Sequence, residues 1–173
     1  GFISETRPYG VPEFAQLGVS ATAYFDSRDS PNFTRSGWNI RAGGSFYPVV
    51  FEDGKPFGTM QVSAATYLTP PELSRLTLAL RATGRLTMGN VPVHESGRYA
   101  GQASAFFNSE LRIRAATLPF VVPWQLGVVG IADLGRVFNV TDDSNVWHGS
   151  AGGGIWFSLP NRSVGGVVTV VAG

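Results

Sequence analysis

Hydrophobic and polar side chains alternate residue by residue along about eight short segments of this chain, and Pro, Gly, Asn and Asp separate the segments. The first segment has an apolar set at Leu17, Val19, Ala21, Ala23 and Phe25. The residues between them form the opposite set, Gly18, Ser20, Thr22, Tyr24 and Asp26. A period of two places these sets on opposite faces of a β-strand, so the pattern predicts a strand with two unlike faces.

The same alternation returns in residues 38–47, 59–68, 76–87, 103–114, 124–134 and 147–157, and more weakly in 164–172. No segment has a sustained helical period, so the chain is predicted to be all-β. Asp53-Gly54 lies between the second and third segments and is a typical hairpin turn. We therefore expect one antiparallel domain over residues 1–173, without an internal boundary.

The distribution of charge over the two faces indicates which face meets water. One face carries charged side chains among small polar ones, at Arg41, Arg81, Arg85, Glu110, Arg112, Arg114 and Asp133. The other face has almost no polar atom larger than a hydroxyl. A soluble barrel such as a lipocalin turns its apolar face inward, whereas an outer-membrane barrel turns it toward lipid. This distribution favours an antiparallel transmembrane β-barrel with a polar lumen.

Large aromatic residues lie near the ends of the predicted strands. They are Trp38, Phe46, Phe57, Trp124, Trp147 and Phe157. An outer-membrane barrel places aromatic girdles at these two levels, next to the lipid headgroups. The alternative is that they are ordinary strand residues of a soluble core.

Composition agrees with a membrane barrel and argues against other classes. Charged residues make up 14% of the chain, against roughly 25% in ordinary soluble domains. The 13 basic and 12 acidic residues nearly balance and do not cluster, so no nucleic-acid partner is expected. There is no cysteine, which excludes disulfides and thiolate metal sites. No apolar run approaches a membrane-spanning helix, so only a closed barrel would cross a bilayer.

Candidate chemistry is sparse. Arg81, Arg85, Glu110, Arg112 and Asp133 form a predicted lumenal charge cluster on neighbouring strands. Glu110 and Asp133 would suit acid–base catalysis as a pair, but beside arginines a charge ladder is the better interpretation. The histidines, His94 and His148, and the pair Asp142-Asp143 lack the further ligands that a metal site needs. We expect no enzyme activity, no metal and no cofactor.

Four motifs carry a resemblance to a known family. Residues 24–31 read YFDSRDSP and residues 34–38 read TRSGW, with Asp26, Arg28, Asp29, Pro31 and Gly37 as the turn motif. NSELR at 108–112, ADLGRVF at 132–138 and HGSAGGGIW at 148–156 follow in order. Together they resemble the surface-antigen family of bacterial outer-membrane barrels, the BamA/TamA-like superfamily.

The resemblance implies a position within a larger barrel. These segments are similar to the eighth through fifteenth strands of the family's sixteen-stranded barrel. The family's sixth-loop motif, Val-Arg-Gly followed by Phe or Tyr, is expected between Met88 and Arg98 and is absent. Either the sequence is part of a larger barrel, which we favour, or it forms a reduced barrel of about eight strands. By resemblance, the turn at residues 27–37 faces the periplasm.

The function implied by the resemblance is the assembly or translocation of other envelope proteins in the bacterial outer membrane. The expected partners are outer-membrane lipid and client barrel proteins or other envelope subunits. Two alternatives stay open. One is a passive structural or pore-forming barrel subunit, and the other is a soluble, lipocalin-like ligand-binding barrel.

Overall fold

The described part of the chain folds into one antiparallel sheet of eight strands. The computed structural model describes residues 17–48, 56–89, 103–119, 123–138, 146–159 and 165–173. Its strands are β1 (Val19–Asp26), β2 (Gly37–Tyr47), β3 (Phe57–Leu68), β4 (Leu76–Gly89), β5 (Ala103–Leu118), β6 (Trp124–Phe138), β7 (His148–Ser158) and β8 (Gly165–Ala172), with one short 3-10 helix, η1 (Pro71–Leu73), between β3 and β4. The all-β prediction and the eight alternating segments are confirmed.

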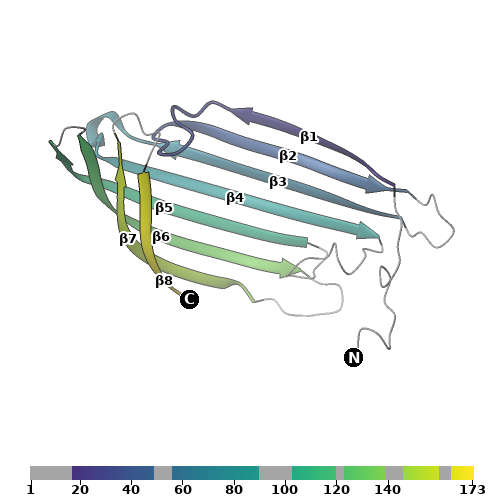
Figure 1. The fold of residues 1–173 in the computed structure, drawn as a ribbon. Coiled ribbons are helices and arrows are strands. Elements are labelled where there is room, and N and C mark those ends of the chain that lie inside the picture. The colour runs from purple at the N-terminus through teal and green to yellow at the C-terminus, as the bar shows by residue number, and fades with distance from the viewer. Residues whose placement is uncertain (1–16, 49–55, 90–102, 120–122, 139–145, 160–164) are drawn as a thin grey trace.

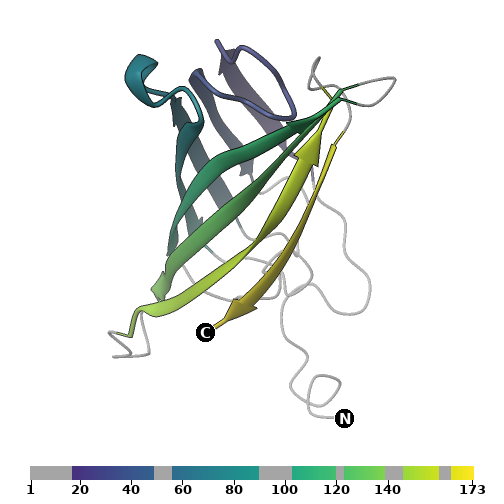
Figure 2. The same cartoon turned by 90° about the vertical axis from the view of Figure 1, so that its left-hand side faces the viewer.

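Each strand pairs with the next strand along the chain, so the sheet order is the sequence order (Figure 1). The sheet is strongly curved, and Figure 2 shows its strands arranged around an open trough. Within the described part of the chain, β1 pairs only with β2 and β8 only with β7. The sheet is therefore not closed, and these strands do not by themselves make the reduced barrel.

The strand register keeps the two faces of the sequence pattern separate across the sheet. Arg41 of β2 lies opposite Tyr24 of β1 and Ser63 of β3, all of the polar set. Ile40 lies opposite Phe25 and Ala64, all of the apolar set. Because side chains alternate along a strand, one pairing of this kind determines which face each of the remaining residues of the strand occupies.

Two clusters of buried apolar side chains lie on the concave side of the sheet. One cluster contains Ala65, Tyr67 and Ala79 of β3 and β4. The second joins Phe33, from the turn between β1 and β2, to Val129 of β6 and Trp156 of β7. This turn, residues 27–36, thus folds inward and reaches strands far from its own in the sheet.

Several sequence predictions fall outside the described residues. These are the Asp53-Gly54 turn, His94, the Asp142-Asp143 pair and most of the region where the sixth-loop motif was expected. They stay predictions.

Candidate functional site

The outward face of the sheet is apolar and exposed. Side chains of this face are between 36% and 79% exposed at Val19, Phe25, Ile40, Met60, Val62, Leu80, Leu86, Met88, Phe107, Leu111, Ile113, Val128, Leu134, Ile155, Val168 and Val170. An exposed apolar surface that continues over all the strands is far larger than a soluble monomer carries. It marks the surface as one that a partner or a lipid covers.

Aromatic side chains border this outward face at both ends of the strands. At the end of the strands where the β1–β2 turn lies, the rings of Trp124 and Phe157 lie 5.6 Å apart, and Trp38 is 50% exposed. At the opposite end, the Trp147 ring lies 6.2 Å from that of Phe107. The outward aromatics therefore form two rims with aliphatic side chains between them.

Arg136 of β6 is a charged residue on the outward face, at the same end as Trp147. Its guanidinium carbon lies 4.4 Å from the centroid of the Phe138 ring and 6.0 Å from that of Trp147. A cation over aromatic faces suits the border between an apolar surface and water. The alternation along β6 places Arg136 on the same face as Leu134 and Phe138.

One residue assigned to the aromatic girdle lies elsewhere. Phe57 is only 2% exposed and its ring stacks on that of Tyr47, with 4.4 Å between centroids. Phe57 shares a face with Thr59 and Gln61, because alternate residues of a strand point to the same side. Its place at a strand end is as predicted, but its side chain faces the trough and the girdle assignment is wrong.

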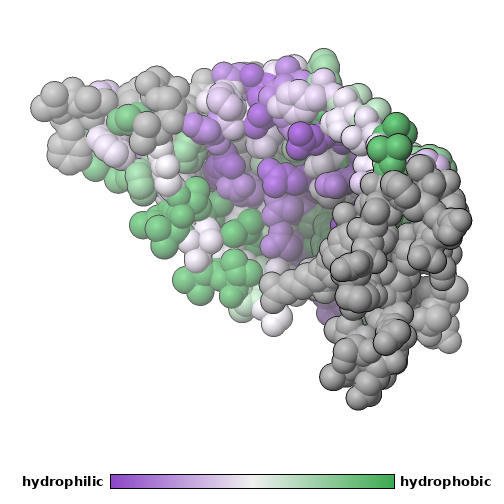
Figure 3. Space-filling model, turned by 45° about the vertical axis from the view of Figure 1, so that its right-hand side comes forward, coloured by the Kyte–Doolittle hydropathy of each residue, from purple (hydrophilic) through white to green (hydrophobic). Residues whose placement is uncertain are grey.

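The concave face carries a network of polar side chains across neighbouring strands. Asn39 donates a hydrogen bond to the Tyr24 hydroxyl at 2.8 Å, and this hydroxyl donates to Asp26 at 2.6 Å. Thr83 donates to the Ser63 hydroxyl at 3.2 Å. Figure 3 shows hydrophilic side chains gathered in a central band with hydrophobic ones at its margins. The band is a surface suited to water.

A hollow of about 330 Å³ lies on this polar face near the middle of β2 and β3. Its lining includes Arg41, Gln61 and Arg85, together with small hydroxyl-bearing residues. Arg81 and Arg85 of the predicted charge cluster are both exposed on this side of β4. The hollow is therefore polar, open and free of an apolar lining that would hold a lipocalin-type ligand.

The two acidic members of the charge cluster have separate partners. Glu110 accepts two hydrogen bonds from Arg112, at 2.6 and 2.9 Å, and both side chains are under a fifth exposed. Asp133 instead accepts hydrogen bonds from Asn108 and, at 3.2 Å, from Ser150. The register sets Asp133 opposite Asn108 rather than Glu110. The groups share a face, but only Glu110 is held by an arginine, whereas the donors to Asp133 are neutral side chains.

The β1–β2 turn holds the motif residues in one hydrogen-bonded unit. Arg28 donates to both carboxylate oxygens of Asp26, at 2.9 and 2.7 Å, and to the Pro31 carbonyl at 3.0 Å. These hydrogen bonds to Asp26 raise the pKa of Arg28 above its ordinary value. Asp29 accepts hydrogen bonds from the backbone N–H groups of Arg35 and, more weakly, Ser36. The motif thus builds a rigid turn.

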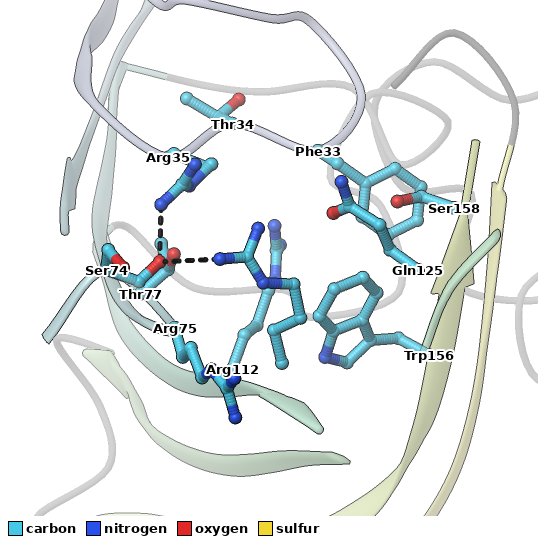
Figure 4. Close-up of a pocket in the computed structure, with 11 residues that line it drawn as sticks. Phe33, Thr34, Arg35, Ser74, Arg75, Thr77, Arg112, Gln125, Trp156 and Ser158 are labelled. Carbon is cyan, nitrogen blue, oxygen red and sulfur yellow. Dashed lines mark hydrogen bonds between the residues drawn. The ribbon is translucent and has the colours of Figure 1, made fainter. Parts of the chain in front are cut away.

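The rigid turn lies over the trough and meets β7. The Phe33 ring lies 5.8 Å from that of Trp156, and both side chains are buried. Beside this contact lies a small hollow lined by arginines from the turn, η1–β4 connection and β5 (Figure 4). Trp156 ends the motif at 148–156, but its contact with Phe33 was not predicted, because a contact across a trough leaves no periodic signal in the sequence.

Comparisons with known proteins give no family. The chain matches no protein-family model, and no curated protein matches it either. The described residues contain no helix long and apolar enough to cross a bilayer. Within the same part of the chain, no His, Cys, Asp or Glu residues gather in a group that would hold a metal ion.

Proposed function

We propose that this chain forms part of the wall of a transmembrane β-barrel in a bacterial outer membrane. The observation that carries the proposal is the polarity of the curved sheet, which is apolar on its exposed outward face and polar in the trough. In water such a sheet would expose its apolar face to solvent. In a bilayer, lipid covers the apolar face and the trough holds water. The two aromatic rims lie where lipid headgroups would meet it.

The same observation weighs against a soluble ligand-binding barrel. Such a barrel turns its apolar side chains inward and its charged ones outward, whereas here Val62 lies on the outward face and Arg41 lines the trough. A protein that stays monomeric in buffer without detergent would contradict the membrane proposal.

Paired substitutions on one strand test which face meets lipid. Leu80 of β4 is 41% exposed on the outward face, and Thr83 faces the trough. Leu80→Arg is expected to cost roughly 2 to 4 kcal/mol of membrane stability, because the charge enters lipid, while Thr83→Arg reaches water and is tolerated. The measurement is the fraction of each variant that folds into phospholipid vesicles in a heat-resistant form. Equal losses for both variants would mean that the faces are assigned wrongly.

Within this proposal, we infer assembly or translocation of other envelope proteins as the activity. The resemblance of the motifs suggests it, and the open sheet offers a physical basis. In the described residues, β1 and β8 each leave one edge without a neighbouring strand. An unpaired edge is a template on which another polypeptide forms a strand through backbone hydrogen bonds.

A client-folding assay separates this activity from a passive barrel or pore. The chain is reconstituted in phosphatidylcholine vesicles, and the folding of an unfolded client barrel is followed by its electrophoretic shift. Faster client folding than in empty vesicles supports assembly. No acceleration, with the chain itself correctly inserted, would leave a passive barrel and remove the assembly proposal.

A further inference from the structure

Arginines from separate parts of the chain line the hollow under the β1–β2 turn. Arg35 comes from the turn itself, Arg75 from the residue before β4, and Arg112 from β5 (Figure 4). Arg114, also of β5, lines the hollow as well. Glu110, the carboxylate next to them on β5, is already bound through both oxygens by Arg112. Within the described residues the hollow therefore carries a clear excess of positive charge.

Two of these arginines share one weak acceptor. The guanidinium groups of Arg35 and Arg114 both donate a hydrogen bond to the backbone carbonyl of Ser74, the latter at 3.5 Å. Among the described residues, neither forms an ion pair with a carboxylate. Two like charges drawn to one neutral oxygen repel each other, and a bound anion would relieve this repulsion.

The opposite wall of the hollow supplies neutral donors. Ser158 of β7 is completely buried, and its hydroxyl has no hydrogen-bond partner among the residues that the structure describes. The register sets it opposite Gln125 of β6, whose half-buried amide lines the same hollow. A buried hydroxyl without a partner costs free energy, so this group also points to an occupant that accepts hydrogen bonds.

We propose that this hollow binds a phosphate-type oxyanion. Guanidinium groups from the turn and from β5, together with hydroxyl and amide groups from β6 and β7, surround the space from several sides, which suits a tetrahedral anion with several oxygens. The hollow is small, with a volume of about 30 Å³, so it suits one small group and not a whole metabolite. The phosphate is either a free ion or the headgroup of a lipid at the membrane surface.

The four arginines differ in their expected contributions. Arg75 is exposed, so water screens its charge, whereas Arg35 and Arg114 are half-buried and directed at the same point. Arg112 keeps one edge of its guanidinium on Glu110 and packs near the Phe33 ring, 5.9 Å from its centroid. Arg35 and Arg114 are therefore the residues on which binding depends most.

The proposal is tested by calorimetric titration of the full chain in dodecyl maltoside with inorganic phosphate, at constant ionic strength set by chloride. Saturable binding is expected, with affinity at least tenfold lower in Arg35→Gln and in Arg114→Gln. Ser158→Ala should lower it less. Arg81→Gln, a change elsewhere on the concave face, is the matched control and should leave the affinity unchanged.

A second arm uses dihexanoyl phosphatidic acid below its micellar concentration to find the source of the phosphate. Tighter binding of this lipid than of inorganic phosphate supports a headgroup site, and equal or weaker binding supports a free-ion site. In the absence of either anion, Arg35→Gln is expected to raise the melting temperature, because it removes like-charge repulsion. Binding of neither probe, or equal affinity in the parent and both arginine variants, would overturn the proposal.

Discussion

At the scale of single residues, Gly37 shows how a turn residue is chosen by its backbone. It begins β2 with a φ of +111°, a conformation in which side chains are strained. A Cβ atom at this position would lie 2.4 Å from the Ser27 carbonyl oxygen. Both constraints come from the compact β1–β2 turn, in which the Ser27 N–H donates to the Trp38 carbonyl at 2.9 Å.

Gly37→Ala is therefore expected to destabilise the protein by about 2 kcal/mol, through backbone strain and the clash with Ser27. The measurement is urea unfolding of the chain in detergent micelles. Gly130→Ala is the matched control, since a Cβ there meets no atom within 4 Å. Equal unfolding midpoints for the two variants would show that the turn tolerates a side chain.

At the scale of elements, β7 combines the smallest and the largest residues on one face. A Cβ at Gly154 would lie 1.9 Å from the Val168 carbonyl oxygen, and one at Gly152 would lie 2.4 Å from that of Val170. Glycine at these positions therefore permits β8 to approach closely. Trp156 follows on the same face, at the point where the folded-in turn meets β7.

Strands were the part of the structure that the sequence predicted best. The period-two alternation is local, so it identified every strand and placed Arg81, Glu110 and Asp133 on a common face. Proximity to a strand end does not determine the face, which is why Phe57 was misplaced. The gathering of Arg35 with Arg114 depends on how far the sheet curves, and no local pattern encodes that curvature.

At the scale of the whole molecule, the trough is an open sheet whose two edges are joined on one side by a turn. Phe33 packs on Trp156 of β7. Its ring is also so close to Gly165 of β8 that a Cβ atom added to Gly165 would lie 2.2 Å from the nearest ring carbon. The turn after β1 therefore contacts the far edge of the sheet. Because no hydrogen bond joins β1 to β8, this contact is expected to set how far apart the edges stand at this end.

Removing the Phe33 ring should let the trough open. Truncating a buried Phe costs about 3 kcal/mol, which here falls on the contact between the turn and β7. The chain has no cysteine, so nitroxide labels attach only at introduced Ala23→Cys and Val168→Cys, both outward and exposed. Pulsed electron–electron double resonance measures the distance between the two labels. Phe33→Ala should give a longer and broader distribution of this distance than the parent. Phe25→Ala is the control, because it removes an outward ring that is 57% exposed. Identical distance distributions for the parent and Phe33→Ala would show that the curvature of the sheet does not depend on the turn.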